Sequence, residues 1–196
     1  GGAEGFHEKS KMDILSPRLR KKFAGRSSWE AIEPIRSRFE EKASDTSPLN
    51  WMSYLDLNLR LPELLLMRVD KMSMATSIEA RVPFLDHHFI QKALSISPNI
   101  KTRGGELKHI LKKAVRGIIP DEIIERKKQG FAVPIEDWMS DKLGAKAEVT
   151  LREFCAETDF LDLEGVENLL KDGSANQVWY LLNFALWWKE YILNKG

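Results

Sequence analysis

The stretch RVDKMSMATSIEARVPFLD, residues 68–86, mixes apolar, charged and small side chains within nineteen positions, and its interpretation decides the fold. A surface loop would not carry so many apolar side chains, and a plain core segment would not carry so many charges. Long charged side chains are seldom fully buried unless they are paired. Ionisable groups among apolar neighbours tend to have shifted pKa values and to mark functional sites. The stretch is therefore either a structural cluster of ion pairs or one wall of a site.

Composition limits the protein class. The 196 residues are 43% hydrophobic and 30% charged, which is ordinary for a soluble globular domain, and the formal net charge of +1 argues against a nucleic-acid partner bound by bulk charge. The single cysteine, Cys155, excludes a disulfide framework and a cysteine-rich zinc site, and it fits a reducing compartment. No apolar run approaches the roughly 20 residues that span a bilayer. We expect a cytoplasmic protein with no membrane partner.

The periodicity outside this stretch is helical, with no alternation typical of strands, so we expect a predominantly α-helical chain. Residues 48–59 read as a mostly buried helix that Leu61–Pro62 ends, because Pro62 suits the first turn of a following helix. That second helix, residues 63–75, is apolar nearly all round, which predicts burial. Three later helices are expected over residues 138–155 (with a break at Gly144), 161–170 and 175–193, the last rich in aromatic residues.

Two further segments carry polar side chains that suit a site. Asp86 is a plausible N-cap for a helix over residues 87–95, but the adjacent His87 and His88 point apart on a helix, so we expect no metal site. Residues 106–115 predict a basic helix with Lys108 and Lys112 one turn apart, an arrangement usually found on a solvated face. Residues 126–130, RKKQG, either fold over an anion or form a mobile connector, and composition does not separate the two.

The order of these motifs resembles the glutamine-hydrolysing asparagine synthetases over about residues 51–188. Residues 61–86 resemble one segment of that family, and the helix with Lys108 resembles its lysine-bearing helix. Residues 126–134, RKKQGFAVP, resemble its glycine-hinged lysine loop. Lys112 departs from the family pattern, where an arginine is expected in many relatives.

The resemblance implies a ligase for asparagine biosynthesis, an ATP-binding amidotransferase that activates the side-chain carboxylate of aspartate with ATP and Mg²⁺. A β-aspartyl-AMP intermediate forms, and ammonia released from glutamine attacks it. By resemblance, Lys128 is the catalytic cation and Glu79 a carboxylate that orients groups or relays protons beside the intermediate. Asp70, Arg81 and Lys108 match positions that hold substrate, intermediate or the wall of the site.

The family's Ser-Gly-Gly-x-Asp-Ser phosphate-binding loop is missing from the chain, and so is the amino-terminal cysteine of the glutaminase half. We therefore expect the helical C-terminal portion of an adenine-nucleotide α-hydrolase-like (ATP pyrophosphatase) synthetase domain, lacking most of its parallel sheet. Residues 1–27 would be a lead that is flexible or left from cloning, and residues 28–196 the helical portion. Alone, such a fragment would be inactive and hold no cofactor tightly.

Its partners would be the missing glutaminase and ATP-binding portions of the same polypeptide, together with small-molecule substrates; a homodimer stays open. Two other functions also stay open. One is the same fragment of a related ATP-dependent amidotransferase or β-lactam-type synthetase that acts on another acid. The other is a helical binding module without the chemistry.

Overall fold

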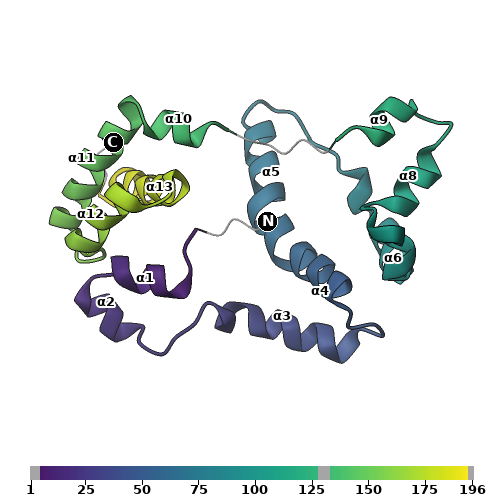
Figure 1. Cartoon of the computed structure of the whole chain (residues 1–196), viewed down its shortest axis with the longest axis horizontal. Coiled ribbons are helices and arrows are strands. Elements are labelled where there is room, and N and C mark those ends of the chain that lie inside the picture. The colour runs from purple at the N-terminus through teal and green to yellow at the C-terminus, as the bar shows by residue number, and fades with distance from the viewer. Residues whose placement is uncertain (1–4, 128–132, 194–196) are drawn as a thin grey trace. The chain divides into compact units, whose positions relative to one another are not determined.

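A computed structural model describes residues 5–127 and 133–193 of the chain, and these residues are built from helices (Figure 1). In this described part, β structure is limited to two isolated bridges, Leu15–Leu161 and Arg116–Ile119. The prediction of a predominantly α-helical chain is confirmed. The chain forms two compact units: unit 1 comprises Gly1–Ser28 and Gly130–Gly196, and unit 2 comprises Trp29–Gln129. No described helix is long and apolar enough to cross a membrane.

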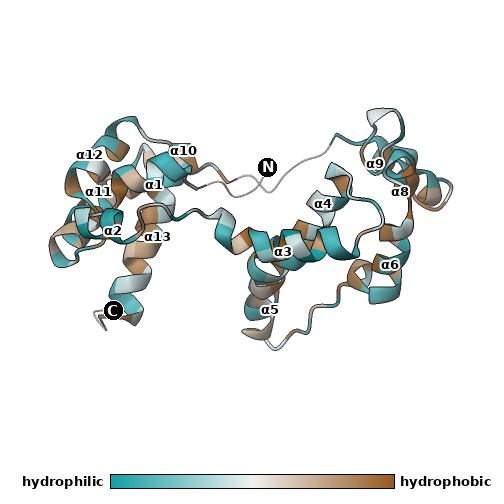
Figure 2. Ribbon diagram, turned by 90° about the horizontal axis from the view of Figure 1, so that it is seen from below, coloured by the Kyte–Doolittle hydropathy of each residue, from teal (hydrophilic) through white to brown (hydrophobic). Residues whose placement is uncertain are grey.

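Unit 1 contains the larger buried core of the described residues. Its helices are α1 (Glu8–Ile14), α2 (Pro17–Lys22), α10 (Ile135–Met139), α11 (Lys142–Glu157), α12 (Leu163–Asp172) and α13 (Ala175–Tyr191). Ala147, Leu151 and Phe154 bury one face of α11 at spacings of four and three residues, the helical repeat. Leu182 of α13 and Val166 of α12 are also fully buried in this cluster. Brown apolar positions recur along these helices in Figure 2.

The end of α1 and the residues after it pack against residues 160–162, which belong to the same unit but lie far along the sequence. The Ser16 amide donates to the Phe160 carbonyl at 2.9 Å, and the Asp162 amide donates to the Ile14 carbonyl at 3.0 Å. Ile14 is buried in the core of unit 1. Within residues 1–27, which the sequence suggests as a lead, the described residues therefore contribute α1 and α2 to this unit.

Local sequence signals set the helix ends of unit 1. The Ser174 hydroxyl accepts from the Gln177 amide and the Gln177 side chain accepts from the Ser174 amide, a reciprocal cap that starts α13. The expected break at Gly144 is wrong: α10 ends at Met139, and Gly144 lies in the first turn of α11. A Cβ on Gly144 would stand 1.9 Å from the Met139 carbonyl oxygen, so only glycine lets the two helices approach so closely there.

Unit 2 is a series of shorter helices. They are α3 (Trp29–Lys42), α4 (Pro48–Leu55), the π-helix η1 (Asp56–Leu66), α5 (Met67–Met74), the 3₁₀ turn η2 (Pro83–Leu85), α6 (His87–Ser95), α7 (Pro98–Lys101), the 3₁₀ turn η3 (Arg103–Gly105), α8 (His109–Val115) and α9 (Asp121–Glu125). The Phe39 ring contacts Trp51 and Tyr54, with ring centroids 5.4 and 5.3 Å apart. Phe39 is buried, as are Ile35 and Ile124.

The helix expected to end at Leu61–Pro62 instead continues from α4 through η1 into α5. Pro62 lies inside the π-helical segment, and the Met67 amide donates to the Pro62 carbonyl five residues earlier. Proline has no amide hydrogen, and in an α-helix its ring clashes with the carbonyl four residues before it. The wider π turn, in which hydrogen bonds span five residues, accommodates Pro62 without ending the helix.

The expected burial of residues 63–75 is wrong for the structure of this chain. No residue of α4, η1 or α5 is buried. Met72 is 73% exposed, and the apolar side chains around it are also exposed. We define the apolar surface as the exposed apolar residues between α4 and α6: Met52, Leu59, Leu65, Met67, Val69, Met72, Met74, Ile78, Val82, Phe84 and Phe89.

Candidate functional site

Two helices joined by a tight turn, α8 and α9, frame a pocket of about 660 Å³ in unit 2. Its lining combines six apolar side chains with four basic residues and one acid, Glu125. The lining residues are Leu107, Lys108, Leu111, Lys112, Val115, Ile119, Ile123, Ile124, Glu125, Arg126 and Lys127. We call this the α8–α9 pocket, and we call Lys108, Arg126 and Lys127 its cationic rim. In the described part of the chain, no ion pair engages these three side chains.

Lys108 lines this pocket from an unusual backbone position. It has φ 59° and ψ 25°, the left-handed conformation, and stands as the N-cap of α8. That conformation is uncommon for residues other than glycine. The helix expected to begin at Glu106 therefore begins at His109, and Glu106 lies in the turn before it.

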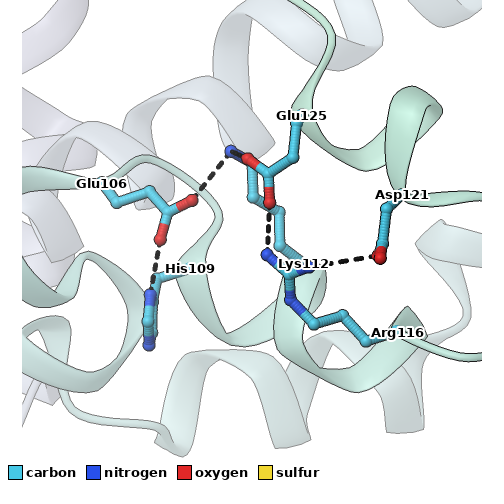
Figure 3. A network of polar contacts seen from close by, with 6 residues as sticks. All are labelled: Glu106, His109, Lys112, Arg116, Asp121 and Glu125. Atoms are coloured by element: carbon cyan, nitrogen blue, oxygen red, sulfur yellow. Dashed lines mark hydrogen bonds and ion pairs between the residues drawn. The ribbon is translucent and has the colours of Figure 1, made fainter.

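Because Glu106 precedes this turn, its carboxylate reaches side chains of α8. Oε2 contacts Nδ1 of His109 at 2.6 Å, and Oε1 accepts from Nζ of Lys112 at 2.8 Å (Figure 3). The pKa of Glu106 is lowered to about 2, first by the hydrogen bond from Lys112 and then by that from His109. The same contact with Glu106 raises the pKa of Lys112. Both groups therefore stay charged at neutral pH.

A second set of contacts ties α8 to α9. The Arg116 guanidinium donates to Oε1 of Glu125, and its Nη1 donates to Oδ1 of Asp121 at 3.1 Å. Oε2 of Glu125 also lies 3.6 Å from Nζ of Lys112, which links the two sets. The pKa of Arg116 is raised, chiefly by its hydrogen bond with Glu125. Figure 3 shows the six residues together, and we call them the polar network: Glu106, His109, Lys112, Arg116, Asp121 and Glu125.

The other site residues expected from the sequence lie apart from this pocket's lining. Nη2 of Arg81 donates to Oε2 of Glu79 at 3.1 Å, and both side chains are exposed. Asp70 lies on α5, where its backbone carbonyl accepts from the Ser73 hydroxyl at 3.2 Å. None of the described contacts joins Asp70 to Glu79 or Arg81. Lys128 lies outside the described residues.

Most of the polar network was not predicted from the sequence. Glu106 and Lys112 are six residues apart, a spacing that does not pair on a continuous helix. They meet because the left-handed Lys108 delays the start of α8 to His109, which leaves Glu106 in the turn before the helix. The contacts of Arg116 cross the turn at Gly117, whose φ is 77°. The sequence does contain one signal for a tight helix pair: Gly117 follows a basic helix, and Pro120 and the acids Asp121 and Glu122 come soon after it.

Side chains that could bind a metal ion do not gather into a site in the described part of the chain. No group of three or more His, Cys, Asp or Glu residues there could hold a metal ion. His87 and His88 were expected to point apart, which is wrong: their ring centroids lie 3.8 Å apart, with the ring planes tilted by 40°.

Comparison with known proteins identifies the family. The family model for asparagine synthase matches residues 5–189. The chain is 32% identical over 197 residues to asparagine synthetase [glutamine-hydrolyzing] 1 of Bacillus subtilis, covering 95% of this chain and 29% of that protein. It is 36% identical over 108 residues to asparagine synthetase [glutamine-hydrolyzing] 1 of Saccharomyces cerevisiae, covering 49% of this chain and 18% of that protein.

A third relative has a different name. The amidase chry2 of Gibberella zeae is 26% identical over 138 residues, which cover 66% of this chain and 20% of that protein. No solved structure matches the chain. The chain thus spans less than a third of the length of these relatives. Because the family model covers nearly all of its length, the chain belongs to the asparagine synthase family.

Proposed function

We propose that this chain supplies the helical portion of the synthetase part of a glutamine-hydrolysing asparagine synthetase. The overall reaction converts ATP, L-aspartate and L-glutamine into L-asparagine, AMP, pyrophosphate and L-glutamate through β-aspartyl-AMP. The observation that carries this proposal is the family match over residues 5–189, together with 32% identity to a relative of that name.

The α8–α9 pocket supports the proposal that an anionic substrate binds beside this helix pair. Adenylate formation places negative charge on the reacting phosphate and on the leaving pyrophosphate, and fixed cations stabilise that charge best in a site shielded from water. Arg126 and Lys127 contribute two of these cations to the pocket. Lys128 follows them in the sequence, and we propose it as the cation that contacts the reacting phosphate.

Glu79, Arg81 and Asp70 are proposed to form another wall of the same catalytic centre. A carboxylate that orients a nucleophile or relays a proton needs a fixed direction, and a neighbouring guanidinium provides one. The 3.1 Å contact from Arg81 to Glu79 supports this assignment. Asp70 is proposed to hold that wall from α5.

The residues present fit the phosphates of ATP better than they fit its metal ion. The cationic rim offers three basic side chains, which suit a polyphosphate. The described carboxylates form no cluster of three for Mg²⁺, so we assign no residue to the metal. When bound, Mg²⁺ would neutralise phosphate charge, and its ligands would come from the rest of the polypeptide.

The apolar surface supports the proposal that the rest of the polypeptide packs against this chain. Eleven large apolar side chains between residues 52 and 89 are exposed, and exposed apolar residues that gather in a patch mark interaction sites. The curated relatives are more than three times as long as the matched region. We therefore propose that the rest of the synthetase, including the glutaminase and ATP-binding portions, covers the apolar surface, and that this chain alone makes no asparagine.

Asparagine formation by a longer protein that contains this chain tests the proposal. With ATP, ammonia and aspartate, that protein should release pyrophosphate and form asparagine, and Lys128→Ala should abolish formation. Lys146→Ala is the control, because Lys146 is an exposed cation on α11 of unit 1. Full activity of Lys128→Ala would remove Lys128 from the catalytic role.

A related enzyme acting on another acid is the second candidate, favoured by the match to a protein named amidase chry2. Pyrophosphate release with a different carboxylic acid, and none with aspartate, would support that candidate and contradict the first. A helical binding module without the chemistry would release no pyrophosphate with any acid.

A further inference from the structure

The short helix α9 is held in place by few contacts. It has five residues, Asp121–Glu125, and such a length is unstable unless neighbouring structure supports it. The Ile123 and Ile124 amides both donate to the Pro120 carbonyl, at 3.0 and 3.3 Å. Ile124 is buried and anchors one face of the helix. Glu125, its last residue, anchors the end through Arg116 and Lys112.

That last residue immediately precedes two of the three members of the cationic rim. Arg126 and Lys127 follow Glu125 in the sequence, and the Cα atoms of consecutive residues are about 3.8 Å apart. The position of the Glu125 backbone therefore fixes where these two cations begin. Figure 3 shows the Glu125 carboxylate pointing at the Arg116 guanidinium, with Asp121 on the other side of that guanidinium.

The Arg116 side chain suits this role better than a lysine would. Its planar fork donates to Asp121 at the start of α9 and to Glu125 at its end, so one side chain spans the whole helix. A lysine ammonium donates from one nitrogen with freely rotating hydrogens, so it fixes the directions of two carboxylates less well than the planar fork does. Lys112 supports Glu125 from a second side, and Glu106 holds Lys112.

We propose that Arg116 and Glu125 are positioning residues, whose ion pair fixes the end of α9 and thereby places Arg126 and Lys127 at the α8–α9 pocket for an anionic, phosphate-bearing ligand. This inference rests on the proposed function, because it deepens the role of the same pocket. Neither residue needs to contact the ligand: their effect passes through the backbone of residues 125–127.

Attraction between charges and positioning by the ion pair predict opposite effects of Glu125→Gln on the affinity for an anion. Glu125 is the one acid in the described lining of the pocket, so Glu125→Gln makes the pocket more positive. Attraction between charges alone would then tighten the binding of an anion. Loss of the ion pair instead frees the end of α9 and weakens binding. Arg116→Lys preserves the charge and removes the fork, so charge alone predicts no change whereas positioning predicts weaker binding.

Inorganic pyrophosphate is the probe, titrated calorimetrically into this chain and its variants at one low salt concentration. Glu125→Gln and Arg116→Lys should each weaken binding about 3- to 10-fold, the effect expected from losing one hydrogen bond that positions the cations. The matched controls are Glu167→Gln and Arg152→Lys, which alter a pair in unit 1 held by two hydrogen bonds of 2.6 and 3.1 Å. Neither control should change the affinity.

Tighter or unchanged binding by Glu125→Gln would overturn the inference, as would equal affinity of Arg116→Lys and the original chain. An original chain that binds no pyrophosphate would also overturn it. Thermal unfolding of each variant, measured in parallel, shows which of the compared proteins are folded. If either Glu125→Gln or Arg116→Lys does not fold, the affinity of the remaining variant tests the inference. Asparagine formation by the longer protein tests the proposed function separately, so the two failures are distinguishable.

Discussion

Gly165 and Asp13 approach so closely that a Cβ atom on Gly165 would lie 2.2 Å from the Asp13 carbonyl oxygen. The contact joins α12 to α1, two helices from opposite ends of the sequence. Backbone atoms cannot yield as the tip of a flexible side chain can, so any side chain at residue 165 must push the helices apart. The N-terminal segment therefore depends on a glycine about 150 residues away.

Gly165→Ala should accordingly destabilise unit 1 by about 1–3 kcal/mol, the usual cost of overpacking. Urea unfolding followed by tryptophan fluorescence measures this loss. Glu164→Ala, at an exposed position in the same helical turn, should cost only about 0.5 kcal/mol. A Gly165→Ala protein as stable as the original would contradict the close approach of α1 and α12.

Leu151→Ala should lower the free energy of unfolding by about 2–5 kcal/mol. Leu151 is fully buried in the core of unit 1, so its truncation removes apolar contacts and leaves a cavity. Val149→Ala on the same helix is the control, because Val149 is 57% exposed and should change stability by less than about 0.5 kcal/mol. Similar losses for both variants would mean that α11 buries a different face.

Acid should destabilise both units over one pH range. The pKa of Glu8 is lowered to about 2 by hydrogen bonds from Lys11 and Ser28, as that of Glu106 is by Lys112 and His109. A carboxyl whose folded pKa is depressed stabilises the fold above its ordinary value of 4.5. That stability is lost progressively as pH falls from 4.5 through about 2.

The midpoint of urea unfolding, measured between pH 6 and about pH 2, should therefore fall in this range. Glu106→Gln should show a shallower fall, because a neutral amide has no proton to gain. Identical pH profiles for Glu106→Gln and the original chain would show that the Glu106 contacts contribute no pH dependence.

Cys155 should react slowly with iodoacetamide at neutral pH. Partial burial raises the pKa of its thiol, and the charges of Asp162 and Glu167 raise it further. The thiolate is the reactive species, so a raised pKa leaves less of it. Alkylation followed by mass spectrometry should become several-fold faster in urea. Equal rates in the folded and unfolded protein would contradict this environment for Cys155.

Local sequence signals predicted several helix ends correctly. Asp86 caps α6 as expected, with its carboxylate accepting from the Phe89 amide at 3.0 Å. A cap needs only residues within one turn of each other, so it can be recognised in the sequence. The α-helical class was likewise predictable, because helical periodicity repeats along most of the chain.

Features that depend on distant or atypical geometry were not predictable. Pro62 normally ends a helix, and no local signal announces the π turn that accommodates it. Lys108 in a left-handed conformation breaks the usual preference for glycine, so the start of α8 and the reach of Glu106 were missed. The exposure of Met72 was not predictable either, because helical periodicity shows that a helix is apolar and not whether another element of the chain packs on it.

Unit 1 is interrupted in the sequence by the whole of unit 2, and this order constrains how the chain folds during synthesis. The Ser16 hydroxyl donates to the carbonyl of Asp159, 143 residues later. Ribosomes add roughly 5–20 residues per second, so α1 and α2 wait about 7–30 s for this partner. Unit 2 is completed during that wait. Helices α1 and α2 thus find their native contacts only after unit 2 has been synthesised, and in the interval they are available to chaperones.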